Sequence, residues 1–114
     1  MRNWNIKPSC LCRKHLIGEH GEIHKAVGNL KHSGKWTKNL TNKGFLEPQN
    51  FLKRHNLIAK EMIKRGYNHK SPLEIEGLKL EKGKVDKKKA INDLKNRCLE
   101  CKKLIELKGV KNEI

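Results

Sequence analysis

The sequence contains no long hydrophobic run and no hydrophobic segment at its N-terminus. A membrane-spanning helix needs about 20 mostly apolar residues in a row, and no segment of this chain approaches that length. Residues 1–5 also lack the apolar stretch of a signal peptide. We therefore expect an intracellular protein with no membrane partner. In such a protein the four cysteines are more often thiols or metal ligands than disulfides.

Several common catalytic signatures are also missing. The chain has no glycine-rich phosphate loop, no nucleophile elbow, no paired-carboxylate metal signature and no internal repeat. Apolar residues make up only 35% of its 114 residues. We therefore expect one domain, residues 1–114, with a modest core and little apolar material to spare for a large hydrophobic pocket.

Positive charge is abundant. Lysine and arginine number 27 against 12 acidic residues, which gives a formal net charge of +15. On so small a domain these positive charges repel one another unless a polyanion is bound, and double-stranded DNA offers closely spaced phosphates. A charged surface adapted to heat or salt is the alternative explanation. An acidic membrane surface is disfavoured because no lysine-rich amphipathic stretch carries bulky aromatic residues.

Apolar residues at helical spacing predict an all-α fold of about three helices. The first covers about residues 10–31, the second follows Pro48 and ends before Gly66, and the third runs from residue 86 to about Gly109. Basic loops are expected between them, at residues 33–44 and 67–84, the second with a brief extended piece at most. The expected architecture is a compact, monomeric single domain with an extended N-terminal arm.

Three side chains that could carry chemistry share one face of the first helix. His15, Glu19 and Glu22 follow one another at steps of four and three residues. This acid/base cluster is a candidate site. The alternative is a solvated polar face on which Glu22 pairs with Lys25.

A metal site has weaker support. His20 and His24 are four residues apart, a spacing at which two imidazoles reach one metal, whereas His55 lies on the apolar face of the second helix and is expected as a packed, hydrogen-bonded residue. The cysteines are candidate zinc ligands, but two of them fall on the apolar seam of the third helix. Buried thiols are therefore favoured over a structural zinc ion at these four residues: Cys10, Cys12, Cys98 and Cys101.

Two segments resemble a known family. Residues 15–23, HLIGEHGEI, resemble the first helix of the pyrimidine-dimer DNA glycosylases of the phage endonuclease V type, and residues 64–68, KRGYN, resemble the end of their second helix. The similarity covers about residues 1–70. Residues 68–72 and 97–101 look like segments of phage and microbial members of that family.

The resemblance implies a DNA repair enzyme that cuts duplex DNA at cyclobutane pyrimidine dimers. In that family the N-terminal α-amine attacks the damaged nucleotide, releases the base through an imine, and β-elimination then breaks the strand, so the enzyme is both a glycosylase and an abasic-site lyase. Glu22 matches the family's essential glutamate and Met1 matches its N-terminal residue, so these two are the implied catalytic residues. No cofactor is required for this chemistry.

The duplex and its lesion are expected to meet a set of mostly basic, histidine and aromatic side chains. The departures from the family pattern are Gly21 in place of an arginine, Lys25 in place of a second basic contact, and the lack of an aromatic tail, so the lesion can differ. The expected contact residues are Arg2, His15, Glu19, His20, His24, Lys25, Trp36, Arg54, Lys64 and Arg65.

Three alternatives remain open at this stage. One is a non-catalytic nucleic-acid-binding module stabilised by zinc. The second is a metal-dependent nuclease that uses His20, His24 and Glu22. The third is a glycosylase or nuclease for a different lesion or a modified base.

Overall fold

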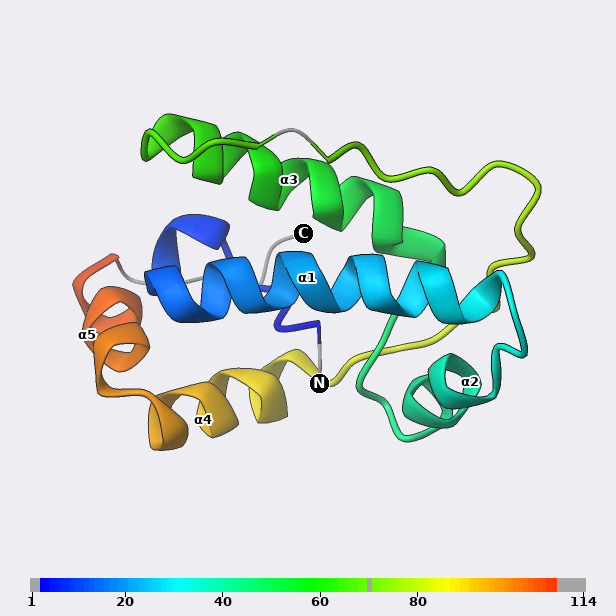
Figure 1. Ribbon diagram of the computed structural model, residues 1–114. Coiled ribbons are helices and arrows are strands. Elements are labelled where there is room, and N and C mark those ends of the chain that lie inside the picture. Colours follow the sequence, from blue (N-terminus) through cyan, green and yellow to red (C-terminus); the bar gives the residue numbers. More distant parts are fainter. Residues whose placement is uncertain (1–2, 70, 109–114) are drawn as a thin grey trace.

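Helices account for all the regular secondary structure in the described part of the computed structural model, residues 3–69 and 71–108 (Figure 1). This confirms the all-α prediction. The number of helices was underestimated, because five α-helices and two short 3-10 helices are present in these residues. In chain order they are η1 Pro8–Cys10, α1 Arg13–Leu30, α2 Lys35–Asn42, η2 Pro48–Asn50, α3 Phe51–Lys64, α4 Lys87–Arg97 and α5 Leu99–Lys108.

The long helix α1 lies antiparallel to α3, and the two bury their apolar faces against each other (Figure 1). Leu16 and Ile23 on α1 and Phe51 and Ile58 on α3 have no exposed surface. The N-terminal arm contributes Ile6 to the same core. The Cα radius of gyration is 13.7 Å, which agrees with the value of about 13 Å expected for a folded chain of this size.

The segment after α1 corrects one prediction. Residues 33–44 were expected as a loop, but Lys35–Asn42 form α2. Two threonines make this polar helix possible, because Thr37 is buried and its Oγ1 donates to Ala26 O at 3.1 Å, while Thr41 Oγ1 donates to Thr37 O at 2.7 Å. The helix is therefore joined to α1 through Thr37, and its Trp36 and Leu40 side chains pack against the core.

The end of α3 agrees with the sequence. Gly66 has a φ of 84°, the left-handed conformation that glycine adopts without a steric penalty. The N–H of Gly66 donates to Ile63 O and the N–H of Tyr67 donates to Met62 O, so the last carbonyls of the helix are satisfied.

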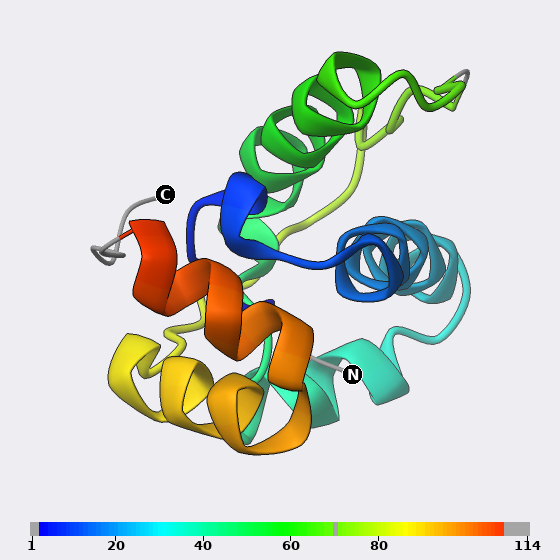
Figure 2. The ribbon, with the colours of Figure 1, turned by 90° about the vertical axis from the view of Figure 1, so that its left-hand side faces the viewer.

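A break divides the expected third helix. Asp86 caps α4 by accepting from Lys89 N–H at 3.1 Å, but Cys98 has extended backbone angles, φ −135° and ψ 110°, and separates α4 from α5. The two helices form an angled pair beside the start of α1 (Figure 2). The expected helix end at Gly109 lies outside the described residues.

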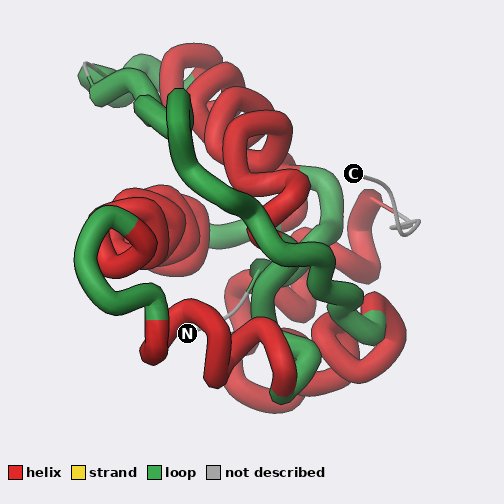
Figure 3. The backbone as a smooth tube through the Cα atoms, turned by 90° about the vertical axis from the view of Figure 1, so that its right-hand side faces the viewer, coloured by secondary structure: helices red, strands yellow, loops and turns green. Residues whose placement is uncertain are grey.

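The residues between α3 and α4 form the long loop that the sequence predicted, and none of those described is in a strand. In Figure 3 this loop crosses the side of the molecule that faces the viewer and returns the chain to α4. None of the described helices combines the length and apolar character needed to cross a membrane.

Candidate active site

A pocket of about 290 Å³ opens beside α1. We call it the α1 pocket. It is close to the lower end, about 300 Å³, of ordinary ligand sites. Its wall comes from the N-terminal arm, α1, the turn after α2 and the end of α4. The lining residues are Trp4, Lys14, His15, Gly18, Glu19, Glu22, Phe45 and Arg97.

The three side chains expected on one face of α1 all line this pocket. His15 and Glu22 are partly exposed there, and the Trp4 ring meets the His15 ring edge-on with their centroids 5.9 Å apart. Burial lowers the pKa of His15, and the nearby charges of Lys14 and Arg97 lower it further. The imidazole is therefore mostly neutral at pH 7, and Glu22 supplies a carboxylate in the same pocket.

Glu19 differs from its two neighbours because it is buried. Its carboxylate accepts two hydrogen bonds from Arg54, from Nε at 2.7 Å and from Nη2 at 2.9 Å. Glu19 is only 2% exposed and Arg54 only 1%. The expectation that these two residues contact DNA is therefore corrected, since neither side chain reaches the surface. They form an ion pair beneath the pocket instead.

This ion pair also holds the N-terminal arm. Arg54 Nη1 donates to Ile6 O at 2.6 Å, and the same Glu19 carboxylate accepts from Asn3 Nδ2 and from Trp4 N–H, each at 3.4 Å. Asn5 turns the arm with a left-handed φ of 56°, a conformation that asparagine tolerates better than most residues. The arm is thus fixed against the floor of the pocket.

The remaining expected contact residues are dispersed. Lys64 is exposed near the end of α3, whereas Lys25 Nζ lies 4.9 Å from the centre of the Trp36 ring, a cation–π contact on the surface. The Arg65 guanidinium makes its hydrogen bonds inside the protein, because it donates to the Glu61 carboxylate and to the carbonyls of Pro8 and Leu11. Met1 and Arg2 lie outside the described residues.

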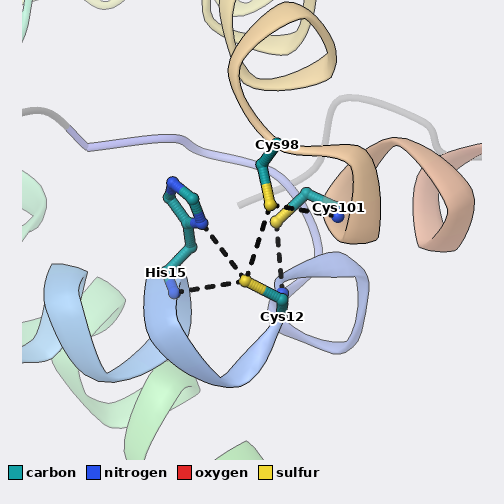
Figure 4. A group of neighbouring side chains, drawn as sticks. All are labelled: Cys12, His15, Cys98 and Cys101. Carbon is teal, nitrogen blue, oxygen red and sulfur yellow. Dashed lines mark hydrogen bonds between the residues drawn. The ribbon is translucent and has the colours of Figure 1, made fainter.

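Four possible metal ligands converge at the N-terminus of α1 (Figure 4). Cys12, His15, Cys98 and Cys101 place one ligand atom each within 4.8 Å of all the others. We call this the thiol–imidazole cluster. It could hold a metal ion. Cys10 was expected among the possible ligands but is buried elsewhere, and His15 takes its place.

Cys98 and Cys101 differ in acidity. Burial raises the pKa of both thiols, but hydrogen bonds from Cys101 and Cys12 outweigh burial at Cys98 and lower its pKa overall. The pKa of Cys101 stays well above its usual value, mainly because that thiol is buried.

Four histidines meet on the other side of α1. His20 and His24 face His55 of α3 and His69 of the following loop, with the Nε2 atoms of His20 and His69 2.9 Å apart and those of His24 and His55 3.2 Å apart. We call this the histidine cluster. His55 is buried and hydrogen-bonded as expected, to Asn56 Oδ1 and Ser71 O, but it also joins His20 and His24 as a possible metal ligand.

The histidine cluster is expected to make stability sensitive to acid. Burial, together with His24, His55 and His69, lowers the pKa of His20 from 6.5 to about 4. Because the unfolded chain binds this proton first, the free energy of unfolding falls as pH drops from 6.5 toward 4, by on the order of 2–3 kcal/mol for this residue. Urea unfolding between pH 7 and 4.5 measures the loss, and His20→Gln should flatten it.

The exposed His32 provides the matched control. A His32→Gln variant keeps the histidine cluster, so its unfolding free energy should follow that of the wild type at every pH. Parallel curves for wild type and His20→Gln would contradict the assignment.

Several pocket residues were missed from the sequence. Lys14, Gly18 and Glu22 follow one another at steps of four residues. On a helix this spacing places them on one face, so the sequence could have indicated that Lys14 and Gly18 lie beside Glu22. Phe45 and Arg97 come from distant segments, and no local pattern indicates that they join this wall.

Comparison with known proteins gives one family. The family model described as pyrimidine dimer DNA glycosylase matches residues 1–75, a stretch that includes the arm, α1, α2 and α3. No curated protein and no solved structure matches the chain.

Proposed function

The chain belongs to the pyrimidine dimer DNA glycosylase family, and from this membership we propose that it cuts duplex DNA at cyclobutane pyrimidine dimers through an imine formed by the α-amine of Met1, assisted by Glu22. A DNA glycosylase role follows from the family itself. The lyase step, the nucleophile and the form of the substrate are the proposed parts. The observation that supports them is the α1 pocket, in which Glu22 and His15 face the fixed N-terminal arm.

The position of the arm supports the choice of nucleophile. Asn3 N–H donates to Phe45 O at 2.8 Å, and Phe45 lines the pocket. Met1 is two residues away, and two residues span at most about 7 Å. The proposal requires the Met1 α-amine to reach a sugar bound in the pocket, and this short distance from Asn3 allows it. The ordinary pKa of an α-amine, about 7.7–8.0, leaves a neutral fraction able to attack at pH 7, unlike a lysine near 10.4.

The proposed reaction has two stages. The amine forms a bond to C1′ of the damaged nucleotide, and the glycosidic bond breaks with its electron pair leaving on the base, which takes up a proton. The sugar ring then opens to an imine. Loss of a proton from C2′ expels the 3′ phosphate and breaks the strand. Glu22 stabilises the positive charge that develops on the sugar and accepts and returns these protons.

The nuclease alternative finds no support in the geometry. His20 and His24 lie with His55 on one side of α1, and this group of possible ligands does not include Glu22 among the described residues. Glu22 lies in the α1 pocket instead. A metal held by these histidines would not be next to that carboxylate.

The function is tested with a duplex that carries one cis-syn thymine dimer, beside undamaged and abasic duplexes, in buffer without added divalent metal. We expect strand breaks at the dimer and none in the undamaged duplex. Equal cutting of damaged and undamaged DNA, or cutting only after Mg²⁺ is added, would refute the proposal. Cutting confined to the abasic duplex would keep the chemistry and assign a different lesion.

Arg97 is proposed to bind a phosphate at the edge of the α1 pocket, because it is exposed there beside Lys14. Removing one phosphate contact lowers the slope of log K against log salt by about 0.9 for a duplex. We expect this change for Arg97→Gln in binding titrations from 50 to 200 mM salt. Lys102→Gln, an exposed residue of α5 that does not line the pocket, removes the same charge and should leave the slope unchanged.

A further inference from the structure

The thiol–imidazole cluster joins two segments that are far apart in the chain. Cys12 and His15 lie at the start of α1, and Cys98 and Cys101 lie at the break between α4 and α5. The spacing is C-x2-H in the first segment and C-x2-C in the second. Both spacings let two side chains of one turn reach the same metal ion.

We propose that this cluster binds one structural zinc ion through Cys12, His15, Cys98 and Cys101. Three thiolates and one imidazole form a standard tetrahedral set for zinc. With Zn–S bonds of about 2.3 Å, two sulfurs of a tetrahedron are about 3.8 Å apart. Cys12 Sγ and Cys98 Sγ are 3.8 Å apart, and Cys12 Sγ lies 3.2 Å from His15 Nδ1 (Figure 4).

The backbone around the cluster supports the same assignment. Three N–H groups donate to the sulfurs: His15 N to Cys12 Sγ at 3.5 Å, Cys12 N to Cys101 Sγ at 3.2 Å and Cys101 N to Cys98 Sγ at 3.4 Å. A neutral thiol is a weak acceptor, whereas a metal-bound thiolate is stabilised by such donors. Each of the three sulfurs is therefore already provided with the hydrogen bond that a zinc thiolate needs.

Helix α5 has little apolar surface packed against the rest of the fold, whereas α4 buries Ala90 and Leu94 in the core. On α5 only Cys101 and Ile105 are buried, while Leu99 and Leu107 are 65% and 80% exposed. The break between the two helices falls at Cys98, which has extended backbone angles and whose sulfur joins the cluster. A zinc ion bound there would clip the junction of α4 and α5 to the start of α1.

The proposed zinc has a structural role. All four positions of the tetrahedron are filled by the protein, so no position remains for water or substrate. His15 and Arg97, the neighbour of Cys98 in the chain, both line the α1 pocket, so the clip would also fix part of the pocket wall. The site is independent of the proposed function, because it would exist whether or not the chain cuts damaged DNA.

The test is the metal content of the full chain, purified without a histidine tag and refolded with zinc. We expect one zinc per chain, lost in Cys98→Ala and in Cys101→Ala and retained in Cys10→Ala, which removes a buried cysteine outside the cluster. Zinc absent from the wild type would overturn the proposal. So would zinc that survives in Cys98→Ala and is lost in His20→Gln, since the ion would then lie in the histidine cluster.

A second measurement does not depend on how the variants fold. Cobalt titrated into the zinc-free wild type should give the absorption bands of a tetrahedral ion, with intense thiolate-to-cobalt charge transfer, at one equivalent. Cobalt bands without thiolate charge transfer would contradict the assignment.

A conservative variant adds a third test. Cys98→His, which keeps four ligands, is expected to retain the metal that Cys98→Ala loses.

Discussion

Glu22→Gln is expected to slow strand cutting at a thymine dimer by about 10²–10⁴-fold. Glutamine keeps the size of the side chain but can neither accept a proton nor balance positive charge on the sugar, and a single acid/base group contributes about this much. Glu22 is only partly buried in the pocket wall, so the fold should be unaffected. Single-turnover cutting measures the effect, and binding to the same duplex should change by no more than about threefold.

The exposed Glu106 of α5 supplies the control for this substitution. Glu106→Gln changes the net charge by the same amount away from the pocket and should cut at the wild-type rate. If Glu22→Gln also cut at that rate, Glu22 would have no part in the chemistry, although the family assignment would stand.

Arg54→Met is expected to lower the free energy of unfolding by about 3–5 kcal/mol. The substitution leaves the buried Glu19 carboxylate without its charged partner, and an uncompensated buried charge costs about this much. It also frees Ile6 O and so loosens the arm beneath the pocket. A small domain is stable by only about 5–15 kcal/mol, so the loss is a large share of the total.

Urea unfolding of Arg54→Met beside Lys53→Met provides the comparison. Lys53 precedes Arg54 on α3 and is exposed, so its substitution should change stability by no more than about 0.5 kcal/mol. Equal stability of the two variants would mean that the ion pair contributes nothing. A double variant, Glu19→Leu with Arg54→Met, removes both charges and should recover part of the loss.

The helices that the sequence predicted best are those with a clear apolar face. Leu16 and Ile23 on α1 and Phe51 and Ile58 on α3 recur at helical spacing, and all four are buried where these two helices meet. Helix α2 is short, and its apolar face consists of Trp36 and Leu40, beside the buried Thr37 and Thr41. Its content of Asn, Thr and Lys resembles that of a loop, and no local pattern indicates the hydrogen bonds that join Thr37 to Ala26 and Asn29.

The break at Cys98 was missed for a different reason. Apolar and cysteine residues continue at steps of three and four across it, from Leu94 through Cys98 to Cys101 and Ile105, as they would in one helix. This periodicity gives no sign that the backbone of Cys98 is extended and not helical. The sulfur of Cys98 meets Cys12, which comes from the other end of the chain and is not visible in the local pattern.

The candidate site was predicted in part. Helical spacing placed His15, Glu19 and Glu22 on one face, and all three line one pocket. Spacing could not indicate that Glu19 is neutralised by Arg54, 35 residues away. Nor did it distinguish Cys10 from Cys12 as a partner of Cys98, because that depends on how the arm enters α1.

The central claim is that the N-terminal amine attacks the sugar of a damaged nucleotide. Borohydride reduces an imine to a stable amine, so it links the enzyme covalently to its substrate during turnover. The decisive measurement is trapping on a duplex with one cis-syn thymine dimer, followed by mass analysis of the cross-linked peptide. We expect an adduct on the Met1 peptide with the dimer duplex and none with undamaged DNA. An adduct on a lysine peptide, or cutting at the dimer with no trapped adduct, would contradict the claim.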